Sequence, residues 1–276
     1  MQDKHLNITK YLDILCCPIC YDGFCFSHKR LKCIKNHSFD ISKNGYINFN
    51  IKKAYSDNEL KFFLNQRKII LSGLFDEVIE KLKYIVIKNI PPKSIILNAC
   101  CGEGSLLHKL NLLSQEYNYM GIDISRTAIK LASKKFENIL WFVSNIDNLN
   151  IKNNSIDLIL NFLAPANYKE FSRILKNNGY FFKIIPSENH FIEIRDILFY
   201  NRYRNYKGEN VVEKYFSKRF KMNEVIEFLY KKKLSESLKE HLLKTNQLFI
   251  DFQKNKIERL PDEVTIHLKL FIGTKK

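Results

Sequence analysis

The stretch "SIILNACCGEGSLL", residues 94–107, decides how this chain is expected to fold. Its first part is a short apolar run, which predicts a buried strand, and its last part begins a helical pattern. The turn between them contains Gly102 and Gly104, so backbone N–H groups and a helix N-terminus can approach a ligand there. Asp123 follows Gly102 by 21 residues, at the end of the next predicted strand. An acid in that place can accept both hydroxyls of a ribose.

Strand and helix patterns alternate from residue 94 onward, and Ser125 is expected to cap the second helix. This alternation predicts a Rossmann-like α/β fold with a mostly parallel sheet covered on both faces. A helix is expected over residues 168–178, ended by Gly179. Residues 188–240 look largely helical, and residues 263–276 read as one or two closing strands. Three parts are predicted: a small module (1–50), a helical connector (51–88) and the α/β domain (89–276).

The glycine-bearing turn favours S-adenosylmethionine over a dinucleotide. A dinucleotide normally requires the fuller Gly-x-Gly-x-x-Gly pattern, whereas S-adenosylmethionine carries no phosphate and needs only close backbone approach. Methyltransferase turns of this kind usually begin with an acid and a glycine, which Asn98 and Cys100 replace here. Because Cys is small, we expect weakened rather than abolished donor binding. Asn145, after the third strand, could face the adenine or occupy an ordinary turn. A Rossmann-like fold without any ligand is the alternative.

A second pattern is Cys17-Pro-Ile-Cys20, followed after twelve residues by Cys33-Ile-Lys-Asn-His37. Three thiolates and one imidazole at this spacing suit tetrahedral Zn²⁺, whereas buried free cysteines are the alternative. Four protein ligands close such a site, so a structural zinc without chemistry is predicted. The neighbouring Cys16 and Cys25 are expected to be packing residues.

The formal net charge is +16, which favours a polyanionic partner such as nucleic acid. A lysine-rich surface encoded by an AT-rich gene would give the same charge. Arg195, Arg202 and Arg204 are more informative because they are interleaved with aromatic residues, a combination that suits RNA phosphates and bases. No apolar run reaches membrane-spanning length and the N-terminus lacks a signal-peptide pattern, so a cytoplasmic protein without a membrane partner is expected.

These segments together resemble the RlmA-type 23S rRNA (guanine-N1)-methyltransferases over nearly the whole chain. The resemblance is carried by the cysteine-rich residues 16–49, by "CGEGSLL" (101–107) with "GIDISRTAIKLASKKF" (121–136), and by Ala164-Pro165. "SENHFIEIRDILFYN" (187–201) is similar to the family's His-x-x-Glu-x-Lys/Arg helix, and "TIHLKLF" (265–271) to its final strand. The methyltransferase motifs are generic, but the cysteine-rich module joined to the His190 segment is specific to this family.

The resemblance implies methyl transfer from S-adenosylmethionine to N1 of one guanine in a hairpin of 23S rRNA domain II. It also implies a homodimer, since the family tends to dimerise. The implied zinc ligands are Cys17, Cys20, Cys33 and His37. The implied cofactor contacts are Phe75, Gly102, Glu103 and His190. The family usually has Tyr in place of Phe75, so a hydroxyl contact is lost there.

The sequence does not identify the base that removes the guanine N1 proton. Lys43, Asn161, Glu193 and Arg195 are candidates, each with a structural role as an equal alternative. The predicted fourth strand ends in "NFLAP" (161–165), so Asn161 and the carbonyl near Pro165 lie where many methyltransferases present the target atom, although Pro165 could equally start a helix. Two further functions stay open. One is a small-molecule methyltransferase, and the other is a rRNA-binding or assembly protein without catalysis, which Cys100 would favour.

Overall fold

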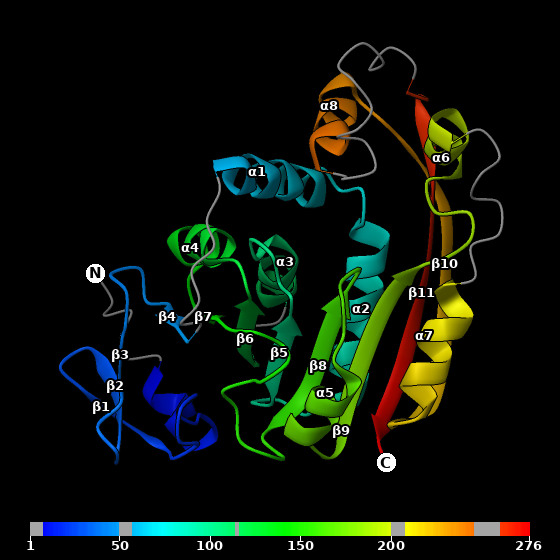
Figure 1. The fold of residues 1–276 in the computed structure, drawn as a ribbon. Coiled ribbons are helices and arrows are strands. Elements are labelled where there is room, and N and C mark those ends of the chain that lie inside the picture. Colours follow the sequence, from blue (N-terminus) through cyan, green and yellow to red (C-terminus); the bar gives the residue numbers. More distant parts are fainter. Residues whose placement is uncertain (1–7, 50–56, 114–115, 200–207, 246–259) are drawn as a thin grey trace.

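The central element of the fold is an eight-stranded sheet, seen in a computed structural model (Figure 1). The structure describes residues 8–49, 57–113, 116–199, 208–245 and 260–276. The strand order is β10-β11-β9-β8-β5-β6-β7-β4. The strands are β4 (Ile47–Asn48), β5 (Ile95–Ala99), β6 (Asn118–Asp123), β7 (Ile139–Val143), β8 (Ile156–Phe162), β9 (Leu175–Pro186), β10 (Phe220–Lys233) and β11 (Glu263–Lys275). The six strands from β4 to β9 run parallel, β11 pairs antiparallel with β9, and β10 pairs antiparallel with β11.

Helices cover both faces of this sheet. Successive side chains of its strands point to opposite faces, and the apolar ones on each face are buried in a separate core. The helices are η1 (Ile8–Ile14, a 3-10 helix), α1 (Asp57–Leu71), α2 (Asp76–Asn89), α3 (Ser105–Leu113), α4 (Arg126–Lys135), α5 (Tyr168–Ile174), α6 (Ile192–Phe199), α7 (Gly208–Ser217) and α8 (Glu236–Thr245). On β5, Ile96 packs with α2, α3 and α4, whereas Leu97 packs on the other face with η1, α5 and α7. The prediction of a Rossmann-like sheet covered on both faces is confirmed.

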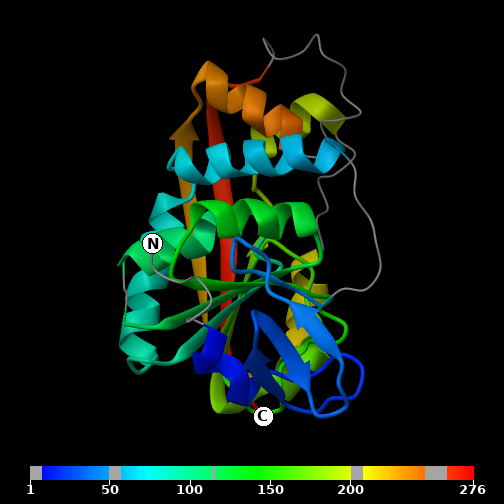
Figure 2. The same ribbon diagram turned by 90° about the vertical axis from the view of Figure 1, so that its left-hand side faces the viewer.

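Helix α1 lies above the carboxyl ends of the central strands, where it faces α3 and α4 (Figures 1 and 2). Helix α8 packs on the outer side of α1. There the imidazole of His241 meets the side-chain amide of Asn65, with His241 Nδ1 2.9 Å from Asn65 Oδ1. Ser125 caps α4 as predicted, since its hydroxyl accepts from Ala128 N at 3.2 Å. Glu59 of α1 accepts a hydrogen bond from the same hydroxyl, so α1 is tied to the start of α4.

The N-terminal segment forms a small sheet of β1 (Phe24–Ser27), β2 (Arg30–Cys33) and β3 (Ser38–Asp40), which lies beside the β7 edge of the large sheet (Figure 1). Strand β4, at the end of the same segment, pairs parallel with β7. The Phe49 ring stacks on Phe142 with centroids 5.4 Å apart. The small sheet therefore shares apolar contacts with the large one. The predicted boundaries at residues 50 and 88 stay a prediction.

Two of the element predictions are wrong. The helix expected over residues 168–178 ends at Ile174, because Leu175 already pairs with Ile156 as the start of β9. The segment 188–240, expected to be largely helical, contains the 14-residue strand β10. Burial alternates along much of β10, which is the period of a strand, but its sequence contains adjacent apolar residues at 225–226 and 228–230. Among the described residues, no helix is long and apolar enough to cross a membrane.

Candidate functional site

The four predicted zinc ligands converge at the end of the small sheet. One nitrogen or sulfur atom from each of Cys17, Cys20, Cys33 and His37 lies within 4.8 Å of the others. His37 Nδ1 is 3.5 Å from Cys17 Sγ and 3.4 Å from Cys33 Sγ, and Cys20 Sγ is 3.5 Å from Cys33 Sγ. Tetrahedral Zn²⁺ with bonds of about 2.0–2.3 Å requires ligand atoms separated by roughly 3.5 Å. The donor set and its spacing therefore fit zinc.

Two similar turns bring these ligands together. In the first, Tyr21 N donates to Cys17 O at 2.9 Å, and in the second Asn36 N donates to Cys33 O at 2.9 Å. Tyr21 and Asn36 both have positive φ, 62° and 63°, so each turn closes through one left-handed residue. Of the two other cysteines in this segment, Cys16 is buried as expected, but Cys25 is exposed on β1. The expectation that Cys25 is a packing residue is therefore wrong.

The glycine-bearing turn connects β5 to α3 at the carboxyl edge of the sheet. Cys100, Gly102 and Gly104 all have positive φ, at 58°, 56° and 85°. A Cβ on Gly104 would lie 2.5 Å from Trp141 Cη2, so only glycine fits there without a shift. Asp123 at the end of β6 accepts from Gly102 N at 2.9 Å and from Ser125 N at 2.8 Å. Burial raises the pKa of Asp123, although these backbone N–H groups lower it.

Helix α1 closes the turn through an ion pair that the sequence did not predict. Arg67 Nε lies 2.6 Å from Glu103 Oε2, with 15% and 2% of the two side chains exposed. The Glu103 carboxylate also accepts from Ser105 N at 3.1 Å and Ser105 Oγ at 3.0 Å. Arg67 further donates to Leu131 O at 3.2 Å. Glu103, an implied cofactor contact, is thus engaged within the protein and holds the turn to α1 and α4.

Two buried oxygen atoms beside the turn have no hydrogen-bond partner among the described residues. They are Asn98 Oδ1 and Gln66 Oε1. The Asn98 side chain is 2% exposed, and Gln66 Oε1 would lie 2.8 Å from a Cβ on Gly102. An unsatisfied buried acceptor is costly unless a ligand completes it. Two open acceptors beside this turn, where Gly102 has no side chain to collide with Gln66, therefore fit the ammonium and hydroxyl donors of S-adenosylmethionine. Sequence reasoning missed Gln66 because α1 reaches the turn only in the fold.

The other predicted cofactor residues are spread around this edge. Asn145 is exposed, and its Oδ1 accepts from Asp147 N at 3.0 Å, as in an ordinary turn. Phe75 is buried and packs edge-on against Phe162 at the end of β8, with ring centroids 5.5 Å apart. His190 lies against β11 and accepts at Nδ1 from His267 N at 3.3 Å. Burial lowers the pKa of His190 to about 3, so its ring is neutral. No contact within the described residues joins His190 to the turn.

Three of the four candidates for the base are engaged within the protein. Glu193 accepts from Thr265 N at 2.8 Å and from Thr265 Oγ1 at 2.5 Å. Arg195 donates to Glu188 O, and Lys43 is exposed on a turn of the small sheet. Asn161 is fully buried, and its Nδ2 donates to Ala99 O and Pro165 O, each at 3.0 Å. The basic and aromatic residues 200–206, with Arg202 and Arg204, lie outside the described residues. These roles stay predictions.

Lys183 is a buried cation near this site that sequence reasoning missed. It belongs to β9, is 4% exposed, and donates to Asn161 Oδ1 at 2.5 Å and to Ala164 O. The available signal was a single charged residue inside the apolar run "YFFKIIP" (180–186). Its neighbours place it under the turn that follows β8.

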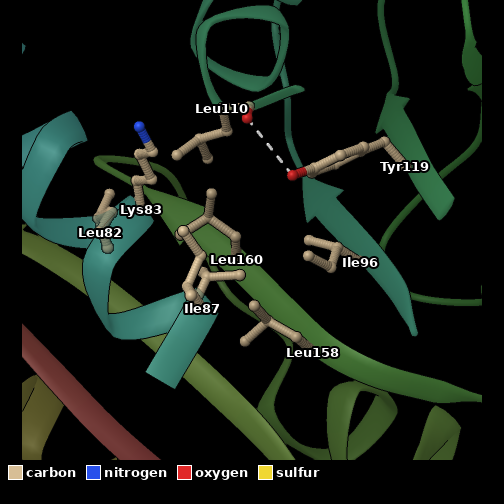
Figure 3. Close-up of a pocket in the computed structure, with 9 residues that line it drawn as sticks. Leu82, Lys83, Ile87, Ile96, Leu110, Tyr119, Leu158 and Leu160 are labelled. Carbon is tan, nitrogen blue, oxygen red and sulfur yellow. Dashed lines mark hydrogen bonds between the residues drawn. The ribbon is translucent and has the colours of Figure 1, made fainter. Parts of the chain in front are cut away.

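A separate apolar crevice lies between α2, α3 and the sheet (Figure 3). Leucine and isoleucine side chains dominate its lining, together with Lys83 and Tyr119. The Tyr119 hydroxyl donates to Leu110 O at 3.4 Å. The lining offers no unpaired acceptor for the ammonium group of S-adenosylmethionine. The β5–α3 turn is therefore the site that fits this cofactor.

Comparison with known proteins connects the two sites. Residues 15–49 match the family model described as "RlmA, N-terminal", and residues 96–179 match a methyltransferase domain. YxjB of Bacillus subtilis (strain 168), provisionally named a 23S rRNA (guanine-N1)-methyltransferase, is 29% identical over 275 residues, which are 94% of this chain and 96% of that protein. The chain thus joins an RlmA-type N-terminal segment to a methyltransferase domain, and it is similar to proteins named 23S rRNA (guanine-N1)-methyltransferases.

A second relative is the 23S rRNA (guanine(748)-N(1))-methyltransferase of Streptomyces fradiae. It is 25% identical over 211 residues, which are 75% of this chain and 74% of that protein. Among solved structures, YcgJ from Bacillus subtilis superposes with a TM-score of 0.51 at 14% identity, covering 71% of this chain and 98% of that one. That likeness shows the methyltransferase fold alone.

Proposed function

We propose that this chain transfers a methyl group from S-adenosylmethionine to N1 of a guanine in a hairpin of 23S rRNA domain II, in the cytoplasm. The observation that carries the proposal is the pair of open acceptors, Asn98 Oδ1 and Gln66 Oε1, at a glycine turn in a chain that also has the Cys₃His cluster. The substrates named for the relatives support the RNA and the atom.

The residues of the turn would bind and orient the donor, which supplies an electrophilic methyl group on its sulfonium. Asn98 and Gln66 would accept hydrogen bonds from its ammonium group, and Asp123 would accept from its ribose hydroxyls. Gly102 and Gly104 let the backbone approach it closely. Glu103 acts indirectly, because Arg67 holds its carboxylate and thereby the turn. Methyl transfer is an in-line displacement, so positioning of this kind supplies most of the catalysis.

The RNA must present a guanine whose N1 is exposed, since N1 lies in the Watson–Crick edge of a paired base. The carboxyl end of β8, which lies beside the donor turn, is where the base would be placed. The zinc cluster is closed by four protein ligands, so it would shape an RNA-contacting surface rather than take part in the reaction. The net charge of +16 suits the phosphate backbone.

Nucleoside analysis tests this function. Unmodified 23S rRNA transcribed in vitro is incubated with zinc-loaded protein and S-adenosylmethionine, then digested and analysed by mass spectrometry. We expect 1-methylguanosine only in the presence of the donor. A methylated nucleoside other than 1-methylguanosine would mean a different target atom. RNA binding without donor binding, measured by calorimetry, would instead support a non-catalytic rRNA-binding protein.

A further inference from the structure

Lys183 is buried without an acidic partner. Its ammonium group donates to two neutral oxygen atoms, Asn161 Oδ1 at 2.5 Å and Ala164 O. In the part of the chain that the structure describes, no carboxylate forms an ion pair with it. A buried lysine normally has a counterion, because an unpaired charge is costly to remove from water. The positive charge at this place is therefore not balanced by the protein.

The hydrogen bonds around Lys183 connect it to the donor turn after β5 and to the turn after β8, where the guanine would be placed. Asn161 holds Ala99, the last residue of β5 before the donor turn, and Pro165, in the turn after β8. Cys100 in the donor turn directs its thiol toward Pro165 O at 3.7 Å. Lys183 thus lies beneath the place where the donor turn and the β8 turn meet.

The proposed reaction requires a positive charge at such a place. The guanine N1–H bond breaks and its proton leaves to water, so the electron pair stays on the ring and O6 becomes negative. N1 then forms a bond to the methyl carbon while the carbon–sulfur bond breaks, and that bond's electrons return to sulfur. The base is neutral again, and S-adenosylhomocysteine leaves. A preorganised cation in a dry site stabilises the intermediate anion more than water does.

We propose that Lys183 is a positioning residue of this methyl transfer, which acts through Asn161 and the Ala164–Pro165 turn and supplies the positive charge that stabilises the deprotonated guanine. This role rests on the proposed function. Burial lowers the pKa of Lys183 to about 8. Lys183 is therefore mostly charged near neutral pH and loses its proton as the pH rises above 8.

The test is the single-turnover rate of guanine methylation between pH 6.5 and 9.5. Lys183→Met removes the charge and both hydrogen bonds, Lys183→Gln keeps a hydrogen-bond donor without the charge, and Lys183→Arg keeps the charge. The Lys176→Met variant is the control, because Lys176 lies at the other end of β9 and pairs with Asp157 at 2.8 Å. Donor affinity by calorimetry and thermal unfolding verify that each variant is folded.

We expect the Met and Gln variants to be slower than wild type by roughly tenfold or more at pH 7 with unchanged donor affinity, and the Arg variant to recover most of the rate. The ratio of wild-type to Met rates should shrink as the pH rises through about 8, because wild type then loses the same charge. A wild-type rate in the Gln variant, or a ratio of wild-type to Met rates that does not depend on pH, would overturn the proposal. Lys183 would then only hold the turn in place through hydrogen bonds.

A folded Met variant with the wild-type rate would also overturn the role of Lys183 while leaving the proposed function intact. Absence of methylation by the wild type, with donor and RNA both bound, would contradict the proposed function, and the role of Lys183 would fall with it. The Lys176→Met control should match wild type at every pH.

Discussion

At the residue scale, Cys100 combines an unfavourable backbone conformation with a side chain beside the donor turn. Its φ of 58° is one that glycine adopts without strain, and its thiol lies 3.7 Å from Pro165 O. We predict that Cys100→Gly tightens S-adenosylmethionine binding several-fold, because it removes a side chain from the approach to the donor. Stability should change by only about 1 kcal/mol, since relief of strain is offset by greater freedom of the unfolded chain.

Isothermal calorimetry with the Cys100→Gly protein checks this prediction. Cys25→Ser is the control, because Cys25 is exposed on β1 in the small sheet. Donor affinity that stays equal or weakens in the glycine variant would mean that the thiol does not hinder the donor.

Gly104 permits a test of how closely the turn packs. A Cβ there would lie 2.5 Å from Trp141 Cη2 and 3.0 Å from Ala132 Cβ, at a φ of 85°. We predict that Gly104→Ala lowers the free energy of unfolding by about 1–3 kcal/mol, measured by urea denaturation. Gly23→Ala is the matched control, because its Cβ would meet only the flexible end of Lys152 at 3.5 Å. An equal effect of the two substitutions would contradict the packing described for the turn.

Some residues at the site could be predicted from the sequence and others could not, for a physical reason. Gly102, Asp123 and the four metal ligands belong to short-range patterns, in which spacing along the chain fixes what can meet. Gln66 and Lys183 approach the donor turn only because distant elements pack together, so local spacing carries no sign of them. The same packing commits Asn161, near the carboxyl end of β8, to internal hydrogen bonds.

At the scale of elements, one ion pair holds α1 over the donor turn. Arg67 and Glu103 are 2.6 Å apart, and removal of one partner leaves the other charge buried. We predict that Arg67→Met lowers the free energy of unfolding by about 3 kcal/mol and weakens donor binding. Denaturant titration and calorimetry measure these two effects. The double variant Arg67→Met with Glu103→Gln should recover part of the stability, because no unpaired charge is left.

Arg30 supplies the control for this pair. It lies 2.5 Å from Asp40 in the small sheet, but both side chains are more than half exposed. Arg30→Met should change stability by less than about 1 kcal/mol, as expected for an exposed ion pair. A loss of stability as large as that of Arg67→Met would show that burial is not what makes the α1 pair important.

The errors in the predicted helices and strands arise where the local pattern of apolar residues disagrees with the strand pairing in the fold. The end of α5 was placed at Gly179, but pairing of Leu175 with Ile156 begins β9 earlier. In β10, adjacent apolar residues at 225–226 and 228–230 interrupt the alternation that indicates a strand, so the sequence pattern does not reveal it. The strands β5, β6 and β8 were predicted correctly because they are buried, short and bounded by turn residues.

At the scale of the whole molecule, the zinc segment and the methyltransferase sheet share contacts. Strand β4 extends the large sheet, Leu15 forms an isolated bridge with Ile151, and Phe49 stacks on Phe142. We predict one zinc ion per chain by atomic absorption, and a fall in melting temperature of the whole protein when a chelator removes it. The metal replaces an apolar core that the small module is too short to build.

Cysteine variants separate the metal from other effects of chelation. Cys33→Ser should abolish stoichiometric zinc binding, whereas Cys25→Ser should bind zinc as wild type does. Chelation that leaves the melting temperature of the methyltransferase sheet unchanged would contradict the shared contacts described for β4 and Phe49.

Primer extension on 23S rRNA tests the central claim most directly. Unmodified transcript is incubated with zinc-loaded protein, with and without S-adenosylmethionine, and then copied by reverse transcriptase. A methyl group on guanine N1 blocks base pairing, so we predict a donor-dependent stop one nucleotide before a guanine of the domain II hairpin. Extension through that hairpin without a stop, by protein that binds both donor and RNA, would contradict guanine-N1 methylation there.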